Sequence, residues 1–102
     1  MAEVIWAESA LADLDEIADY IALDNPRAAQ KWVKNLIGKV RLLAEFPELG
    51  TQPEELVDFD YRQLLVKPCR IFYRFNQSTQ QVYILHLIRQ EKEVLNFLKN
   101  IQ

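Results

Sequence analysis

The sequence contains few of the residues on which metal sites, disulfides and membrane segments depend. Its 102 residues include one cysteine, Cys69, one histidine, His86, and two glycines. A lone cysteine forms no internal disulfide, and with a single histidine it cannot supply the ligands of an ordinary zinc site. No apolar run approaches the roughly 20 residues that span a bilayer, and no charged-then-apolar leader opens the chain. The sequence therefore predicts a cytoplasmic protein with no cofactor and no membrane contact.

The remaining composition is that of one compact domain. Half of the residues are apolar, which is enough to bury a core, and a chain of this length normally forms one domain. The scarcity of glycine argues against long irregular loops. We expect a single domain over residues 1–102.

The formal net charge of −3 conceals a difference between the two halves of the chain. Residues 1–60 contain five Lys and Arg against thirteen Asp and Glu, whereas residues 61–102 contain seven against two. The halves therefore carry −8 and +5, which sum to −3. Such asymmetry predicts a face that meets an anionic partner, either a nucleic acid or an acidic protein segment. The alternative is that the two halves neutralise each other across the fold.

The first half predicts a short strand followed by two helices. Alternation suggests a strand within Glu3–Glu8, and Ser9 offers a side chain that could cap the next helix. Apolar residues then recur at helical spacing, with acidic residues on the other side. Pro26 suits the first position of a second helix, which Asp24 or Asn25 would cap. The short turn between the two predicts an antiparallel helix hairpin.

Three residues of these elements need separate interpretation. Gly38 lies inside the second helix, where it costs about 1 kcal/mol relative to Ala, so it predicts the close approach of another element. Trp6 is expected in the core. Trp32 falls beside the apolar stripe and belongs either to the core or to a partner site.

The second half is rich in the β-branched and aromatic residues of strands. Three runs, Tyr61–Val66, Arg70–Asn76 and Val82–Arg89, are joined by short turns and predict an antiparallel meander. Gly50–Asp60 is the one loop long enough to move, and helical spacing after Arg89 predicts a C-terminal helix. The expected fold is α+β: an N-terminal strand, an antiparallel helix hairpin packed on a curved antiparallel sheet (β-α-α-β-β-β), and a C-terminal helix.

The basic stretch "RIFYRF" divides its side chains between the two faces of the expected sheet. Alternation assigns Tyr73 to the core side. Arg70, Phe72 and Arg74 then project from the face that the helix hairpin leaves uncovered, or from a strand edge. The cations are thus expected where an anionic partner can reach them.

Four segments together resemble the ParE branch of the RelE/ParE toxin superfamily. They are "VIWAESALADLDEIADYIA", "LLAEFPELG", "YRQLLV" and "RIFYRF", in this order. The resemblance implies the toxin of a type II toxin–antitoxin module, as in bacterial plasmid-stabilisation systems, bound by a cognate antitoxin in a hetero-oligomer. ParE-like members stall DNA gyrase on cleaved DNA, whereas RelE-like members with the same fold cut messenger RNA on the ribosome. The fold alone does not choose between these activities.

Inhibition of gyrase requires a binding surface and no catalytic group. Arginine and aromatic residues are favoured at such surfaces. The residues expected to bind the target or the antitoxin are Arg62, Arg70, Arg74, Arg89 and Lys92.

The ribonuclease alternative requires cations for the phosphate and a group that transfers a proton. The resemblance to RelE-like enzymes assigns the first role to Arg62, Arg70 and Arg89. His86 is the one imidazole that could fill the second, although a partly buried, hydrogen-bonded histidine is the ordinary outcome at a mid-strand position. A third interpretation is a toxin-derived protein that sequesters its antitoxin and harms nothing.

Overall fold

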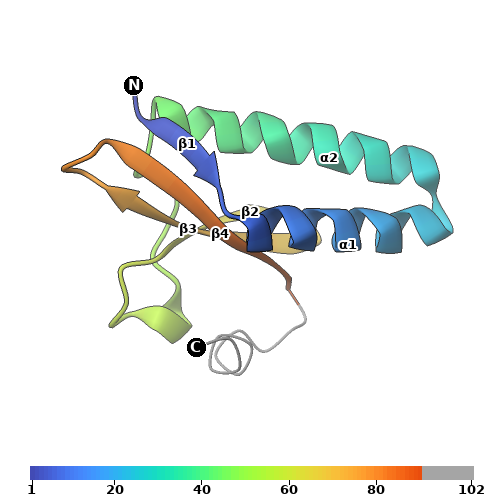
Figure 1. The fold of residues 1–102 in the computed structure, drawn as a ribbon. Helices are drawn as coiled ribbons and strands as arrows, with labels where there is room; N and C mark the ends of the chain where they lie inside the picture. Colours follow the sequence, from blue (N-terminus) through green and yellow to red (C-terminus); the bar gives the residue numbers. More distant parts are fainter. Residues whose placement is uncertain (91–102) are drawn as a thin grey trace.

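The computed structural model describes residues 1–90 as an α+β fold in which a helix hairpin lies along one face of a curved sheet (Figure 1). The expected C-terminal helix and Lys92 lie outside the described residues. The α-helices and strands, with two short 3₁₀ helices (η), are β1 Glu3–Trp6, α1 Glu8–Asp24, α2 Pro26–Arg41, η1 Leu42–Ala44, η2 Glu54–Leu56, β2 Arg62–Val66, β3 Cys69–Asn76 and β4 Gln81–Arg89.

The sheet contains four strands in the order β1-β4-β3-β2. Strands β2, β3 and β4 form the expected antiparallel meander, with the Lys67–Pro68 peptide, which is cis, in its first turn. Strand β1 pairs with β4 in parallel, so the sheet is mixed and not antiparallel throughout. The α+β architecture predicted from the sequence is confirmed.

The two helices begin in different ways. The cap predicted at Ser9 is wrong, because α1 starts at Glu8, directly after Ala7. Ser9 lies in the first turn of α1, and its hydroxyl donates to the carbonyl of Leu85 at 2.8 Å. The cap predicted for α2 is confirmed at Asn25, whose side-chain oxygen accepts the backbone N–H groups of Arg27 and Ala28. Within residues 1–90 no helix is both long enough and apolar enough to cross a bilayer.

The main core fills the space between the helix hairpin and the sheet. Tyr73 and Ile84 of the central strands and Leu36 of α2 are fully buried there. Trp32 also lies in this core, 7% exposed, with its indole N–H donating to the Val66 carbonyl at 3.3 Å. Trp6 is half-buried against the same cluster, so both tryptophans belong to the packing.

The opposite face of the sheet is partly covered by the loop that precedes β2. Leu56 of η2, Phe72 of β3 and Ile88 of β4 form a second cluster, and each is at most 2% exposed. The expectation that Phe72 projects from an uncovered face is therefore wrong. Two backbone hydrogen bonds between Thr51 and Gln63 close the base of this loop, which holds η2 against the sheet.

Gly38 lies on the outer side of α2, and a Cβ added there would meet no atom within 4 Å in the described part of the chain. The close approach that the sequence predicted at Gly38 is therefore not made by any element within residues 1–90.

Candidate functional site

Arg70, on the sheet face covered by η2, is held by the chain's own side chains. Its guanidinium donates to both carboxylate oxygens of Glu55, at 2.8 and 2.9 Å, and to the amide oxygen of Gln63 at 2.7 Å. It also stands 5.1 Å from the centre of the Phe72 ring. The hydrogen bonds from Arg70 lower the pKa of Glu55 to about 2. Arg70 is thus paired as it would be with a bidentate anionic ligand.

Arg62, at the start of β2, is bound to a turn of the preceding loop. Its guanidinium donates to the carbonyl oxygens of Glu48 and Gly50, at 3.2 and 2.8 Å. Tyr73 fixes the same turn, because its hydroxyl accepts the Gly50 N–H at 2.8 Å and donates to the Pro47 carbonyl at 2.9 Å. Burial raises the pKa of Tyr73. The hydroxyl therefore stays protonated and acts as a structural group.

Arg74 is exposed on β3, directly across from Tyr83 on β4. Both line a hollow of about 730 Å³, which Arg62 also reaches from β2. The Arg74 side chain forms no hydrogen bond or ion pair with another residue of the described part. Two carboxylates, Glu48 and Asp60, also line the hollow, so its charge is mixed. The site combines an available guanidinium with a half-buried aromatic ring.

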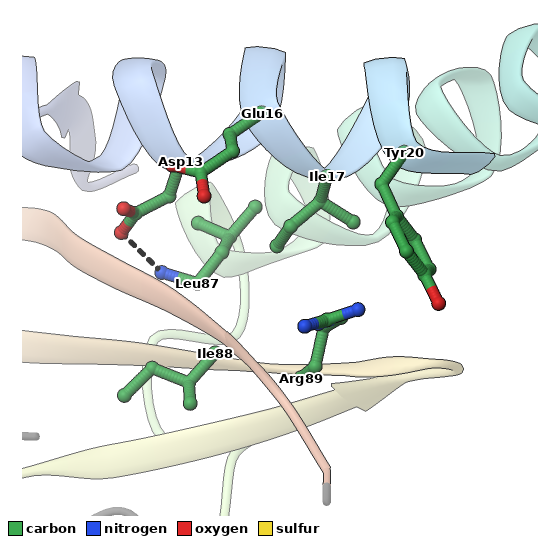
Figure 2. A pocket seen from close by; sticks show the side chains of 7 residues that line it. All are labelled: Asp13, Glu16, Ile17, Tyr20, Leu87, Ile88 and Arg89. Carbon is green, nitrogen blue, oxygen red and sulfur yellow. Dashed lines mark hydrogen bonds between the residues drawn. The ribbon is translucent and has the colours of Figure 1, made fainter. Parts of the chain in front are cut away.

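Arg89 lies at the far end of β4, beside α1. Figure 2 shows its side chain pointing from β4 toward Tyr20, and the guanidinium is 4.4 Å from the centre of that ring. The pocket between them has a volume of about 180 Å³, and Asp13 and Glu16 of α1 also line it. A cation stacked on an aromatic ring at this distance is a favourable contact, so α1 fixes the position of Arg89.

His86 faces α1 as well. Its Nδ1 lies 3.3 Å from a carboxylate oxygen of Asp13. The same oxygen accepts the backbone N–H of Leu87 at 3.0 Å, which is the dashed bond in Figure 2. An aspartate that contacts a histidine can fix the orientation of its ring. His86 is part-buried here, as expected for a hydrogen-bonded histidine in a strand.

The candidate residues do not gather at one point. Arg62 and Arg74 share one hollow. Arg70 lies across from Ile88, the neighbour of Arg89 on β4, and Arg89 lies across from Cys69. Because neighbouring residues of a strand point to opposite faces, the side chains of Arg70 and Arg89 leave opposite faces of the sheet. The described residues contain no group of three or more His, Cys, Asp or Glu side chains that could hold a metal ion. Burial also raises the pKa of the Cys69 thiol to about 12, which leaves it without nucleophilic character at neutral pH.

Sequence reasoning missed four residues that shape these sites: Glu55, Asp13, Tyr20 and Tyr83. Tyr83 could have been found, because alternation along β4 places it on the side opposite the core residues. Glu55 and Asp13 act on partners 15 or more residues away, and no local spacing marks such pairs.

Comparisons with known proteins lead to toxins of one superfamily. Residues 4–94 match the family described as ParE toxin of type II toxin-antitoxin system, parDE. Toxin RelE2 of Caulobacter vibrioides is 43% identical over 68 residues, which cover 67% of this chain and 73% of that protein. The putative toxin Y4kP of Sinorhizobium fredii is 33% identical over 90 residues, which cover 88% and 93%.

A solved structure, the chromosomal ParDE toxin–antitoxin system from P. aeruginosa, contains a chain of the same fold. It superposes with a TM-score of 0.71 at 28% identity, over 89% of this chain and 98% of that one. The strand order, the helix hairpin and the sequence match therefore lead to the same assignment. The chain belongs to the ParE family of type II toxins, within the ParE/RelE superfamily.

Proposed function

We propose that this protein is the toxin of a type II module that binds and poisons DNA gyrase, and that a cognate antitoxin neutralises it in a cytoplasmic hetero-oligomer. The match to the ParE family over residues 4–94 and the similarity to a ParDE chain support the proposal of a gyrase target.

The observation that carries the proposal is which arginine side chains are exposed and which are already bonded within the chain. A poison that acts by binding requires exposed cationic and aromatic groups, and the hollow lined by Arg74 and Tyr83 offers them. A ribonuclease requires its cations to converge on one phosphate. Arg62 and Arg70 are instead bonded to separate parts of the preceding loop.

A gyrase supercoiling assay tests this function. Purified protein is added to gyrase, ATP and relaxed plasmid, and linear, protein-bound DNA is measured after detergent and protease treatment. We expect cleaved complexes to accumulate with increasing toxin and to disappear when the cognate antitoxin is added first. Unimpaired supercoiling at a large molar excess of toxin would rule out the gyrase target.

A ribosome-dependent ribonuclease is the second candidate, and two observations favour it. Toxin RelE2 is the relative with 43% identity, and Asp13 contacts His86 as an orienting carboxylate contacts a catalytic base. A translation extract programmed with a defined messenger would then yield fragments cut within codons.

His86→Gln separates the two candidates. Glutamine can keep a hydrogen bond to Asp13 but cannot serve as an acid or a base. If the protein poisons gyrase, we expect less than a twofold change in gyrase inhibition. If it cleaves messenger RNA with His86 as the base, the cleavage rate should fall by roughly 100-fold or more. Inactivity of the unmodified protein in both assays, with retained antitoxin binding, would identify an antitoxin-binding decoy.

A further inference from the structure

The helix hairpin separates charge by helix. Every charged residue of α1 is acidic, and every charged residue of α2 is basic. The acidic residues of α1 are Glu8, Asp13, Asp15, Glu16, Asp19 and Asp24, and the basic residues of α2 are Arg27, Lys31, Lys34, Lys39 and Arg41. The two helices run antiparallel and side by side (Figure 1). The exposed acidic residues of α1 therefore form a negative strip on the outer side of the hairpin, beside a positive strip formed by the exposed basic residues of α2.

The charges of α1 and α2 are not paired with each other in the described part of the chain. Within residues 1–90 the ion pairs are Arg70–Glu55 and His86–Asp13, and neither joins α1 to α2. Asp15 and Asp19 on one helix are exposed, as are Lys31 and Lys34 on the other. In the described structure the acidic residues of α1 are therefore not neutralised by the basic residues of α2, and the outer charges remain available to a partner.

A groove runs between the two strips. It has a volume of about 820 Å³, and its lining includes the small side chains of Ala18, Ala22 and Val33, with Asp19 on one side and Lys34 on the other. Gly38 lies further along the outer side of α2, and no atom of residues 1–90 lies within 4 Å of where its Cβ would be. Small residues and a glycine allow another helix to approach closely, which accounts for a glycine that is costly within a single chain.

We propose that a second copy of this chain docks on the outer face of the hairpin. The two copies are related by a twofold axis that runs parallel to the helices. Rotation about such an axis places α1 of one protomer over α2 of its partner, so each acidic strip faces a basic strip twice in one self-complementary interface. A twofold axis across the helices would instead place acidic over acidic. The charge pattern selects the first arrangement, which brings four helices together. This dimer is independent of the target that the toxin acts on.

Other occupants fit the face less well. An acidic peptide or a nucleic acid attracted by Lys31 and Lys34 would also meet the carboxylates of Asp15 and Asp19. A basic segment attracted by the carboxylates of α1 would also meet the lysines of α2. A partner must carry both signs in parallel strips at the spacing of two packed helices, and this chain does so.

The size of the face predicts a weak dimer. Helices of 16 and 17 residues are about 25 Å long, and packed helices lie about 8–10 Å apart. The face thus measures roughly 500 Å² per protomer, or about 1,000 Å² in total, at the lower limit for a specific interface. We expect association in the micromolar range that depends strongly on salt, because exposed ion pairs supply its specificity.

Sedimentation velocity measurements over protein concentrations from about 1 to 500 µM test the dimer. At about 50 mM salt we expect a monomer–dimer equilibrium, and at about 500 mM salt a dissociation constant at least tenfold higher. A monomer throughout the concentration range at low salt would overturn the proposal, and so would a dimer whose affinity is unchanged by salt.

Paired charge reversals identify the surface. Asp15→Lys/Asp19→Lys places two lysines in the acidic strip, and Lys31→Glu/Lys34→Glu places two glutamates in the basic strip. We expect each variant alone to be monomeric where the unmodified protein dimerises, with an unchanged far-ultraviolet circular dichroism spectrum.

An equimolar mixture of the two variants should form a heterodimer, since each strip then faces its opposite. The matched control is Glu45→Lys/Asp58→Lys, which changes two exposed carboxylates away from the hairpin by the same charge. It should dimerise within twofold of the unmodified protein. Failure of the mixture to associate, or equal loss of dimer in the control, would refute docking through this face.

Discussion

Tyr73 of β3 is in close contact with Gly50, in the loop that precedes β2. The tyrosine hydroxyl accepts the Gly50 N–H and donates to the Pro47 carbonyl, and Arg62 donates to the carbonyls of the same turn. A buried polar group without a partner costs about 1–3 kcal/mol, so these bonds stabilise the turn only as a complete set. Alternation in the sequence correctly placed Tyr73 in the core, but it gave no indication that the hydroxyl binds a loop 23 residues away.

Replacement by alanine should lower the stability of the fold at Gly50 and raise it at Gly38. A Cβ at Gly50 would lie 2.6 Å from the Gln63 carbonyl oxygen and 2.7 Å from the Tyr73 ring and hydroxyl, so Gly50→Ala should destabilise the fold by about 1–3 kcal/mol. A Cβ at Gly38 meets nothing within residues 1–90, and alanine has the higher helix propensity, so Gly38→Ala should stabilise the fold by up to about 1 kcal/mol. Urea denaturation at a protein concentration that keeps the chain monomeric measures both. A loss of stability in Gly38→Ala would contradict the open surroundings of that residue.

At the scale of elements, side chains replace missing strand partners at the edges of the sheet. Strand β1 pairs with β4 only as far as Ile84, and beyond it the Ser9 hydroxyl donates to the Leu85 carbonyl and Asp13 accepts the Leu87 N–H. On the opposite edge, Lys39 of α2 donates to the Leu65 carbonyl of β2. Both edges are therefore partly occupied, which limits pairing with other chains.

The elements and the pairing of neighbours along the chain were predictable, and the contacts between distant elements were not. Periodicity of 2 and 3.6 located the helices and the three strands of the meander, and Asn25 was predictable because its bonds lie within three residues. The parallel pairing of β1 with β4 joins residues 78 apart, for example Glu3 and Gln81, and no local pattern encodes it. The same applies to η2, which reaches the sheet through Leu56 and Glu55.

The attachment of η2 should depend on pH. The pKa of Glu55 is lowered from 4.5 to about 2 by its bonds to Arg70. Because the folded-state pKa lies below the unfolded one, the stabilisation is present above pH 4.5 and disappears as the pH falls toward 2. The carboxylate is 39% exposed, so solvent screening reduces the contribution to about 0.5–1 kcal/mol.

Glu55→Gln should therefore reduce the free energy of unfolding at pH 7 by about that amount and have no effect near pH 2. Urea denaturation at pH 7, 4 and 2 measures this difference. The control is Glu54→Gln, an exposed neighbour that makes no ion pair in the described structure. An equal loss of stability at all three pH values would show that the carboxylate charge is not what holds η2.

At the scale of the molecule, the basic half of the sequence is distributed over separate surfaces. The family likeness predicted which arginines to consider, and the fold then separates them, since Arg70 is paired under η2 and Arg89 stacks on α1. The neutralising contact on Arg70 comes from the acidic half, so the alternative of mutual neutralisation holds at that position. It does not hold at Arg74, whose surroundings leave the guanidinium exposed.

A substitution at Arg74 should therefore weaken binding to the target without unfolding the protein. Arg74→Glu changes an exposed side chain with no bond to another described residue, so the free energy of unfolding should stay within about 0.5 kcal/mol. If the hollow contacts gyrase, reversal of this charge should raise the toxin concentration needed for half-maximal DNA cleavage at least tenfold. Lys67→Glu, on the exposed turn between β2 and β3, makes the same charge change at a distance from the hollow and should alter it less than threefold. Equal effects of both variants would mean that net charge, and not the surface around Arg74, governs the interaction with gyrase.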